Sequence, residues 1–325
     1  MPRKIIIELF QKSITKFVTP QDDKVIFMIS SSFTIIALMT AITITSLTYA
    51  KQDLPSSPPP PATTFSFATA GDWGSNTNAR QTANNIISHH EPLVIGLGDY
   101  CYCGSPHTWW NSVIFQLKGV MFRGAEGNHE ISDSGKNASQ LLKDFGQKNW
   151  TTSFNYKNVH FVILDEEHGK LDGNTLDKDL ATARADPAIK WIVVAFHEPI
   201  YTSPSDHAPD ENGIKSTVLP LIDKYHVDLV LQAHNHNYQR SFPLQSDKVT
   251  GNNTNSVYQS PKGTMYMLVG TGGQGNYALR SQANYVQKQF TGTYGFLKVD
   301  ISDTTLIGSF IANDGTIKDT FTINK

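Results

Sequence analysis

Residues 227–236 read Val-Asp-Leu-Val-Leu-Gln-Ala-His-Asn-His, an apolar run that ends in two histidines. An apolar run of this length is typical of a strand that is buried on both faces. In an extended segment residues i and i+2 point to the same side, so His234 and His236 can face one site. Seen alone, such a pair is more often two exposed histidines, and its meaning depends on the rest of the chain.

The same pattern, an apolar run followed by polar or glycine-rich residues, recurs at 65–70, 93–97, 159–164, 191–196 and 265–269. Segments of helical length lie between several of these runs, at 76–89 and 174–186. Three runs near the end look like antiparallel strands joined by tight turns, at 294–301, 305–312 and 316–324. Strands that alternate with helices indicate βαβ units. We therefore predict an α/β fold in which two mixed β-sheets pack as a sandwich flanked by α-helices.

Composition narrows the possible partners only slightly. The chain has 325 residues, is 39% hydrophobic and has a formal net charge of −2, so a large core is possible and no basic field favours nucleic acid. We expect no nucleic-acid partner. The two cysteines, Cys101 and Cys103, are one residue apart. A bridge across so short a span would be strained, and we expect these cysteines to pack rather than to form a disulfide framework.

The N-terminal part predicts export. Residues 25–50 carry no charged side chain, and about 20 apolar residues are enough to cross a bilayer as a helix. Basic residues before this run favour a transmembrane anchor with a short cytoplasmic segment at 1–24; the alternative is a cleaved signal sequence ending near Ala50. A Pro/Ser-rich linker at 51–63 leads to one catalytic domain at 64–325. We expect a membrane-anchored protein with an extracellular catalytic domain, or a secreted one.

Polar residues follow the predicted strands or lie close to their ends. In chain order they are Asp72, Asp99, Tyr102, Asn128, His129, His197, His207, His234 and His236. Ligands of α/β sheets gather at the carboxyl ends of the strands. Asp, Asn and His side chains supplied from five segments are what two neighbouring divalent or trivalent metal ions need.

The order of these segments resembles a known family. The segments are Gly71-Asp72, Gly98-Asp99-Tyr100-Cys101-Tyr102, Gly127-Asn128-His129-Glu130, Val194-Ala195-Phe196-His197 and Ala233-His234-Asn235-His236. They resemble the five ordered motifs of the calcineurin-like metallophosphoesterases, and the purple acid phosphatase branch in particular. Asp72-Trp73-Gly74 lacks the histidine of the common Asp-x-His motif, and Tyr102 stands where that branch has its tyrosine. Ala233 departs from the pattern, which usually has glycine there.

The resemblance implies a role for each of these residues. Asp72, Tyr102 and His236 would hold Fe(III) at a first site. Asn128, His197 and His234 would hold Fe, Zn or Mn at a second site, with Asp99 bridging both ions. Substrate would contact Asn128, His129 and His207, and the two histidines would be catalytic. The implied activity is that of a dinuclear-metal acid phosphatase, which hydrolyses phosphate monoesters of small molecules or proteins by attack of metal-bound hydroxide.

Two other functions stay open at this point. One is a Zn/Mn phosphodiesterase of the same superfamily, and the other is a catalytically inactive surface binding protein. Glu130 could orient a neighbouring ligand or be ordinary turn polarity, whereas for Arg240 we expect a structural ion pair rather than a phosphate contact. The sequence does not indicate an oligomeric state.

Overall fold

The computed structural model describes residues 65–103, 105, 109–132, 138–167, 171–251 and 255–325. The segments predicted at 1–24, 25–50 and 51–63 lie outside these residues. Within the described ranges, no helix is both long and apolar enough to cross a membrane.

Seven strands form the first sheet, in the order β11-β16-β15-β14-β1-β2-β3. Strands β1, β2 and β3 are parallel to one another, and β14, β15 and β16 add antiparallel neighbours beyond β1. Short β11 runs parallel to β16 at the edge. The bounds are β1 (Phe65–Ala70), β2 (Leu93–Leu97), β3 (Met121–Ala125), β11 (Val257–Gln259), β14 (Gly295–Ile301), β15 (Thr305–Ala312) and β16 (Ile317–Asn324).

The second sheet also has seven strands, in the order β13-β8-β12-β7-β6-β5-β4. Its centre, β5, β6, β7 and β12, is parallel, and β4, β8 and β13 are antiparallel to their neighbours. The bounds are β4 (Thr152–Tyr156), β5 (Val159–Ile163), β6 (Trp191–Ala195), β7 (Leu229–Gln232), β8 (Tyr238–Ser241), β12 (Met265–Val269) and β13 (Val286–Phe290). A separate hairpin pairs β9 (Leu244–Gln245) with β10 (Lys248–Val249).

The main core lies between the two sheets. Phe67 of β1 and Phe161 of β5 meet edge to face, with ring centroids 5.2 Å apart. Both strands of this contact are completely or almost completely buried, as expected for strands covered on two faces.

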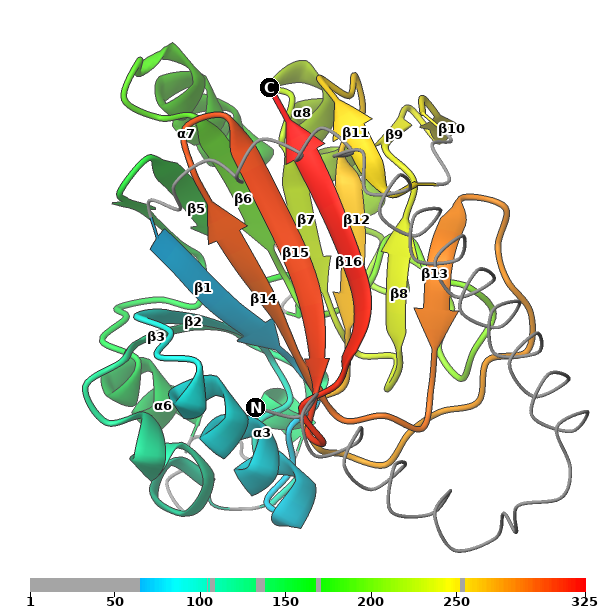
Figure 1. The fold of residues 1–325 in the computed structure, drawn as a ribbon. Helices are drawn as coiled ribbons and strands as arrows, with labels where there is room; N and C mark the ends of the chain where they lie inside the picture. Colours follow the sequence, from blue (N-terminus) through cyan, green and yellow to red (C-terminus); the bar gives the residue numbers. More distant parts are fainter. Residues whose placement is uncertain (1–64, 104, 106–108, 133–137, 168–170, 252–254) are drawn as a thin grey trace, which may run out of the picture. The chain divides into compact units, whose positions relative to one another are not determined.

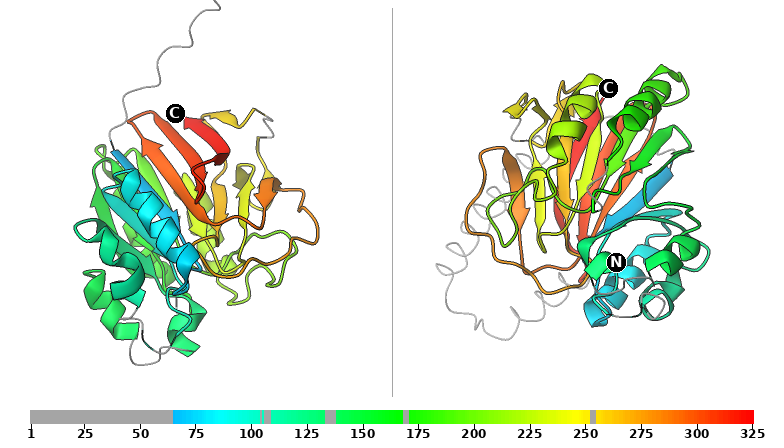
Figure 2. Two further views of the ribbon diagram at one scale, coloured as in Figure 1. Left: turned by 60° about the horizontal axis from the view of Figure 1, so that its bottom comes forward. Right: turned by 180° about the vertical axis from the view of Figure 1, so that it is seen from behind.

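Described helices pack on part of the outer face of each sheet (Figures 1 and 2). Buried side chains of α3 (Thr77–Ser88) pack with those of β1 and β2, together with a π-helical turn η1 (Trp110–Ile114), a 3-10 turn η2 (Phe115–Leu117) and α6 (Ala138–Asp144). On the other side α7 (Gly173–Ala185) and α8 (Lys215–Lys224) pack against β5, β6 and β7. The predicted α/β sandwich with flanking helices is confirmed.

Polar capping residues explain where α3 and α7 begin. Asn76 caps α3, because its side-chain oxygen accepts a hydrogen bond from the Ala79 amide at 3.1 Å. Asp172 caps α7 in the same way through the amides of Asn174 and Thr175. Each of these helices therefore starts one residue after its polar cap, close to the start expected from the sequence.

Candidate metal centre

The loops after β1 and β2 hold each other in place. The Asp72 amide donates to the Gly98 carbonyl at 3.2 Å, and the Trp73 amide donates to the Asp99 carbonyl at 2.8 Å. The residues predicted as ligands in these loops have left-handed backbone conformations, with φ of 55° at Asp72, 54° at Asp99 and 49° at Tyr102. His234 shares this conformation, with φ of 67°. Non-glycine residues are held this way at a cost of roughly 1–3 kcal/mol each, typically at functional sites.

Four potential ligand atoms converge in a first set. The Tyr102 hydroxyl lies 3.1 Å from Asp72 Oδ1, 2.9 Å from Asp99 Oδ2 and 2.9 Å from His236 Nε2. His236 Nε2 also lies 3.4 Å from Asp72 Oδ1. Three oxygens and one imidazole nitrogen therefore meet at one place.

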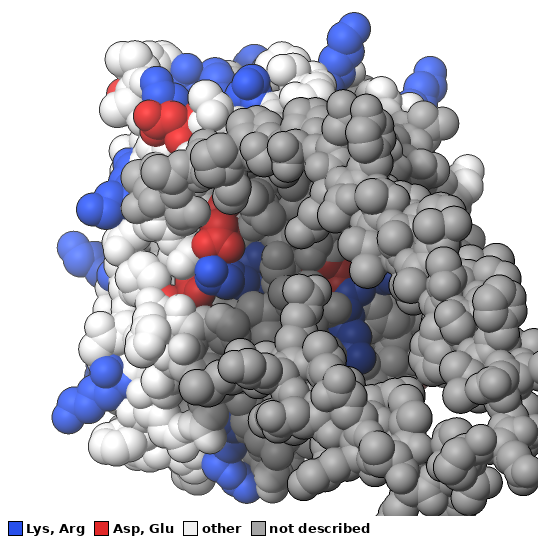
Figure 3. All heavy atoms as spheres, in the orientation of Figure 1, with Lys and Arg blue, Asp and Glu red and all other residues white. Residues whose placement is uncertain are grey.

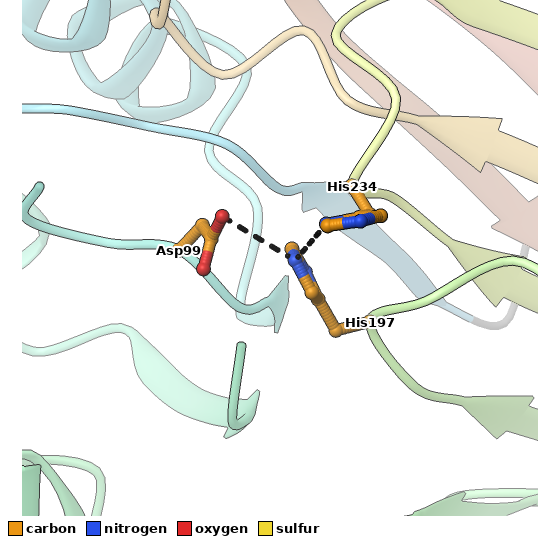
Figure 4. A group of neighbouring side chains, drawn as sticks. All are labelled: Asp99, His197 and His234. Carbon is orange, nitrogen blue, oxygen red and sulfur yellow. Dashed lines mark hydrogen bonds and ion pairs between the residues drawn. The ribbon is translucent and has the colours of Figure 1, made fainter. Parts of the chain in front are cut away.

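A second set forms around His197. Its Nε2 lies 3.2 Å from Asn128 Oδ1, 3.2 Å from His234 Nδ1 and 3.4 Å from Asp99 Oδ2. Figure 4 shows His197 between Asp99 and His234. Because Asp99 Oδ2 belongs to both sets, the structure brings all seven predicted ligands together as two groups that share one carboxylate.

The ligands of each set come from both sheets. Asp72 follows β1, Asp99 and Tyr102 follow β2, and Asn128 follows β3 at the start of a short helix, α5 (Asn128–Ser132). His197 follows β6, whereas His234 and His236 follow β7. The carboxyl ends of parallel strands in the two sheets thus meet at one edge of the sandwich.

Backbone contacts orient the ligating nitrogens. His197 Nδ1 lies 2.6 Å from the Leu97 carbonyl, and His236 Nδ1 lies 2.5 Å from the Gly275 carbonyl. Hydrogen bonds at Nδ1 leave Nε2 of both rings for the centre, as is usual for metal-bound histidine.

Glu130 orients the loop that carries Asp99. Its side chain is fully buried, and its carboxylate accepts hydrogen bonds from the amides of Asp99, Tyr100 and Gly127 at 2.8–3.0 Å. The alternative of ordinary turn polarity is therefore wrong. Buried Glu166 acts in the same way on the other sheet, because it accepts from the amides of His197 and Glu198 at 2.6 and 2.7 Å.

Charges within the centre shift the protonation of its members. Burial opposes ionisation of Asp99, but adjacent His197 holds the pKa of this carboxyl below its usual range. Burial, followed by the charges of the neighbouring His197 and His207, lowers the pKa of His234 to about 3. Burial, followed by the carboxylates of Asp72 and Asp99, raises the pKa of the Tyr102 phenol well above its ordinary value. Carboxylate oxygens beside imidazole nitrogens suit iron, zinc and manganese, so the donors fit the predicted metals.

The two predicted catalytic histidines lie over different ligand sets. The ring of His129 packs on Tyr102, with centroids 4.0 Å apart, and its amide donates to Asp99 Oδ1 at 2.9 Å. The ring of His207 packs on His234, with centroids 3.8 Å apart. Both histidines are half-buried, so each has one side toward the centre and another toward solvent.

Three residues at the centre were not expected from the sequence. Asn235 binds both backbone groups of His207, Tyr277 stacks on His236 with ring centroids 3.8 Å apart, and Glu211 approaches His207 and His234. Asn235 had a usable indication, since it lies between two predicted ligands. Tyr277 and Glu211 come from separate loops without a recognisable motif.

Two other expectations have definite outcomes. The structural ion pair of Arg240 is confirmed, because its buried guanidinium binds Asp319 at 2.6 and 2.9 Å. Cys101 packs in the core as expected, and it is also joined to Cys103 as a disulfide with the Cα atoms 5.0 Å apart. The left-handed conformation of Tyr102 between them turns the chain and brings their Cα atoms within bridging distance.

A cavity of about 560 Å³ lies beside His207. Apolar side chains form much of its lining, together with Arg280, and include Pro204, Ala208, Pro209, Ala283 and Tyr285. Because the ring of His207 packs on His234, the cavity lies close to the second ligand set.

Comparisons with known proteins identify a family and several relatives of this chain. The family model described as calcineurin-like phosphoesterase matches residues 65–238. Purple acid phosphatase 15 of Arabidopsis thaliana is 26% identical in an alignment 252 residues long, which covers 64% of this chain and 44% of the relative. An uncharacterized Mycobacterium tuberculosis protein is 36% identical over 105 residues, or 30% of this chain and 20% of the relative. The chain thus spans about half or less of the length of these relatives.

Solved structures show the same fold. A purple acid phosphatase from yellow lupin (Lupinus luteus) seeds superposes with a TM-score of 0.68 at 20% identity, covering 80% of this chain and 53% of that one. GAP50, the anchor in the inner membrane complex of Plasmodium, superposes with a TM-score of 0.61 at 19% identity, covering 80% and 88%. From the family model, which matches more than half of its length, the chain belongs to the calcineurin-like phosphoesterases, and purple acid phosphatases are among its relatives.

Proposed function

We propose that this chain hydrolyses phosphate monoesters with the help of two metal ions. The observation that carries the proposal is the pair of ligand sets that share Asp99 Oδ2. A bridging carboxylate is what holds two ions about 3.5–4 Å apart, the spacing of two-metal phosphatase sites. Two ions bound here would lower the pKa of a coordinated water and neutralise the phosphoryl oxygens.

The donor atoms suggest which ions these are. The first set has three oxygens, one of them the Tyr102 phenol, and hard oxygen donors favour Fe(III). The second set has two imidazoles, an amide oxygen and the shared carboxylate, which suit Fe, Zn or Mn.

The side chains around the centre have complementary tasks. Asn128 lies at the second set and at the start of α5, the short helix that carries His129, so both residues can contact the phosphoryl group. His207 lies between the second set and the cavity, where the leaving group has room. A proton given by His207 to the leaving oxygen would contribute about 10²–10⁴-fold to the rate.

The charge of the chain and its N-terminal sequence extend the proposal to the substrates and the location. Described Lys and Arg side chains occur in separate places on the face shown in Figure 3, with Asp and Glu side chains between them. The formal net charge of −2 provides no basic field, which supports phosphorylated small molecules or proteins rather than nucleic acid. The uncharged run at 25–50 supports a catalytic domain that is anchored outside the cell or secreted.

The decisive experiment combines spectroscopy with turnover. The domain from about residue 60 is purified, its metals are quantified, and its visible spectrum is compared with that of Tyr102→Phe. An absorption band that disappears in the variant, with two ions per chain and hydrolysis of p-nitrophenyl phosphate, is expected. A colourless protein with two Zn or Mn ions that prefers bis(p-nitrophenyl) phosphate would favour a diesterase. A protein that binds ions but hydrolyses neither ester would favour the inactive binding protein.

A further inference from the structure

Glu211 lies at the point where His207 and His234 meet. Its Oε2 lies 3.4 Å from His207 Nδ1 and 3.5 Å from His234 Nε2. Its other oxygen, Oε1, accepts a hydrogen bond from the Ala208 amide at 2.7 Å. One carboxylate is therefore fixed to the loop of His207 while its second oxygen faces two imidazole nitrogens.

Glu211 faces one ring nitrogen of each histidine, His207 Nδ1 and His234 Nε2. The other nitrogen of each ring remains for a substrate or for the second ligand set. His234 Nδ1 belongs to the second ligand set, so its Nε2 points outward, and this atom is buried without a hydrogen bond in the described structure. A histidine that binds a metal commonly donates its other N–H to a carboxylate. In His207 the contact at Nδ1 leaves Nε2 for a substrate.

We propose that Glu211 is a positioning residue, which fixes the ring of His207 through Nδ1 so that Nε2 faces the leaving oxygen of the substrate. This inference rests on the proposed phosphatase function. The same carboxylate oxygen also orients His234, so the proton donor and the second ligand set share one anchor. As the bond between phosphorus and the leaving oxygen breaks, its electron pair stays on that oxygen, which takes the Nε2 proton of His207. The attacking water supplies the new oxygen of phosphate and loses a proton to solvent, from which His207 is later reprotonated.

A third metal ion is the competing explanation for this cluster. The ligand atoms of His207, Glu211 and His234 lie within 4.8 Å of one another. An ion there would bind the outward nitrogen of His234 while the other nitrogen serves the second set. Both nitrogens of one ring would then need to be deprotonated, whereas a hydrogen bond to Glu211 requires only the ordinary neutral ring.

The test uses substrates that differ in their need for a proton. A nitrophenolate leaves without protonation, whereas an alkoxide needs a proton, so p-nitrophenyl phosphate and glycerol phosphate are compared in wild type, Glu211→Ala, Glu211→Gln and His207→Ala. Loss of the anchor is expected to lower kcat for glycerol phosphate about 10–100-fold, the usual effect of removing such a partner, with much less effect on p-nitrophenyl phosphate. Glu211→Gln retains an acceptor oxygen and is expected to restore part of the rate. His207→Ala/Glu211→Ala is expected to equal His207→Ala alone.

Other results would overturn the inference and leave the proposed function standing. These are equal losses for both esters with both ions bound, no loss for either, or a third ion per chain that disappears in Glu211→Gln. If the wild type hydrolyses neither ester, the proposed function itself fails. Circular dichroism of each variant separates these effects from misfolding, and Glu211→Gln keeps the test possible if the alanine variant does not fold.

Discussion

The methyl group of Ala233 lies against Gly71, in the space that a side chain on Gly71 would occupy. A Cβ atom built on Gly71 would lie 2.5 Å from Ala233 Cβ, far closer than two carbon atoms can approach. The chain therefore tolerates alanine where its family usually has glycine because the opposite residue has no side chain. Ala233 is also not among the residues with positive φ, so its backbone conformation imposes no penalty.

This contact predicts a compensating pair of substitutions. Gly71→Ala is expected to destabilise the fold by about 1–3 kcal/mol, the usual cost of overpacking. Ala233→Gly alone should have a small effect, and adding it to Gly71→Ala should recover part of the loss. Recovery will be incomplete, because the new Cβ would still lie 2.9 Å from Leu97 Cβ. Urea unfolding of the four proteins measures the coupling, and strictly additive effects would contradict it.

Asn235 holds the backbone of His207, so its substitution is expected to affect His207 separately from the substitution of Glu211. Its Oδ1 accepts from the His207 amide and its Nδ2 donates to the His207 carbonyl, both at 3.0 Å. Asn235→Ala removes both bonds and is expected to cost about 1–3 kcal/mol in stability and to slow turnover of glycerol phosphate.

Asn237 provides the matched control for that substitution. It is equally buried, and it ties the same loop to the sheet at Ser205 by a 3.1 Å bond rather than at His207. Asn237→Ala should lose similar stability but retain its preference between glycerol phosphate and p-nitrophenyl phosphate. If both variants change that preference equally, the backbone bonds to His207 have no special role.

The buried ion pair of Arg240 and Asp319 predicts a large loss of stability. It joins β8 of the second sheet to β16 of the first, and Arg240 is 1% exposed. Asp319→Ala leaves a buried guanidinium without its partner and is expected to cost about 3–5 kcal/mol. The exposed pair of Lys224 and Asp177, at 2.7 Å, is the control, since exposed pairs contribute about 0–1 kcal/mol. Chemical denaturation of Asp319→Ala and Asp177→Ala would show equal losses if burial were unimportant.

Because the pKa of the Glu126 carboxyl is raised, the metal-free protein is expected to lose stability as pH rises. Burial, followed by Asp165 and Glu167, raises the pKa of Glu126 to about 8, compared with roughly 4.3 in an unfolded chain. Between these values the folded state keeps a proton that the unfolded state has lost, so the free energy of unfolding falls as pH increases. Glu126→Gln should make this dependence less steep. Thermal unfolding in the presence of a chelator at several pH values measures it, and an unchanged slope would be inconsistent with a protonated Glu126.

The fold was predictable where strands are mainly apolar. The predicted bounds of β1, β2, β12 and β15 agree with the structure, because each strand is a mostly buried run between polar turns. Strands β3 and β8 were not predicted. Arg123 interrupts the first, and the second contains Arg240, whose charge is hidden by an ion pair with a distant strand.

The candidate site was predictable only in part, for a related reason. Its seven proposed ligands stand in ordered local motifs, and the structure brings them together, although their role as metal ligands stays a prediction. Glu211 approaches His234 and Tyr277 stacks on His236, each from a loop that folds back from elsewhere in the chain. Such contacts depend on how loops pack, and no spacing within either loop indicates them.

Because each ligand set is divided between the two sheets, an ion bound there would also hold the sheets together. By mass action, such an ion would raise the free energy of unfolding by roughly 2.7 kcal/mol when its free concentration is 100 times its Kd. The link between Arg240 and Asp319 depends on no ion. The two sheets are thus held together by contacts that need no ion, and a bound metal would add a contact whose strength depends on the surrounding metal supply.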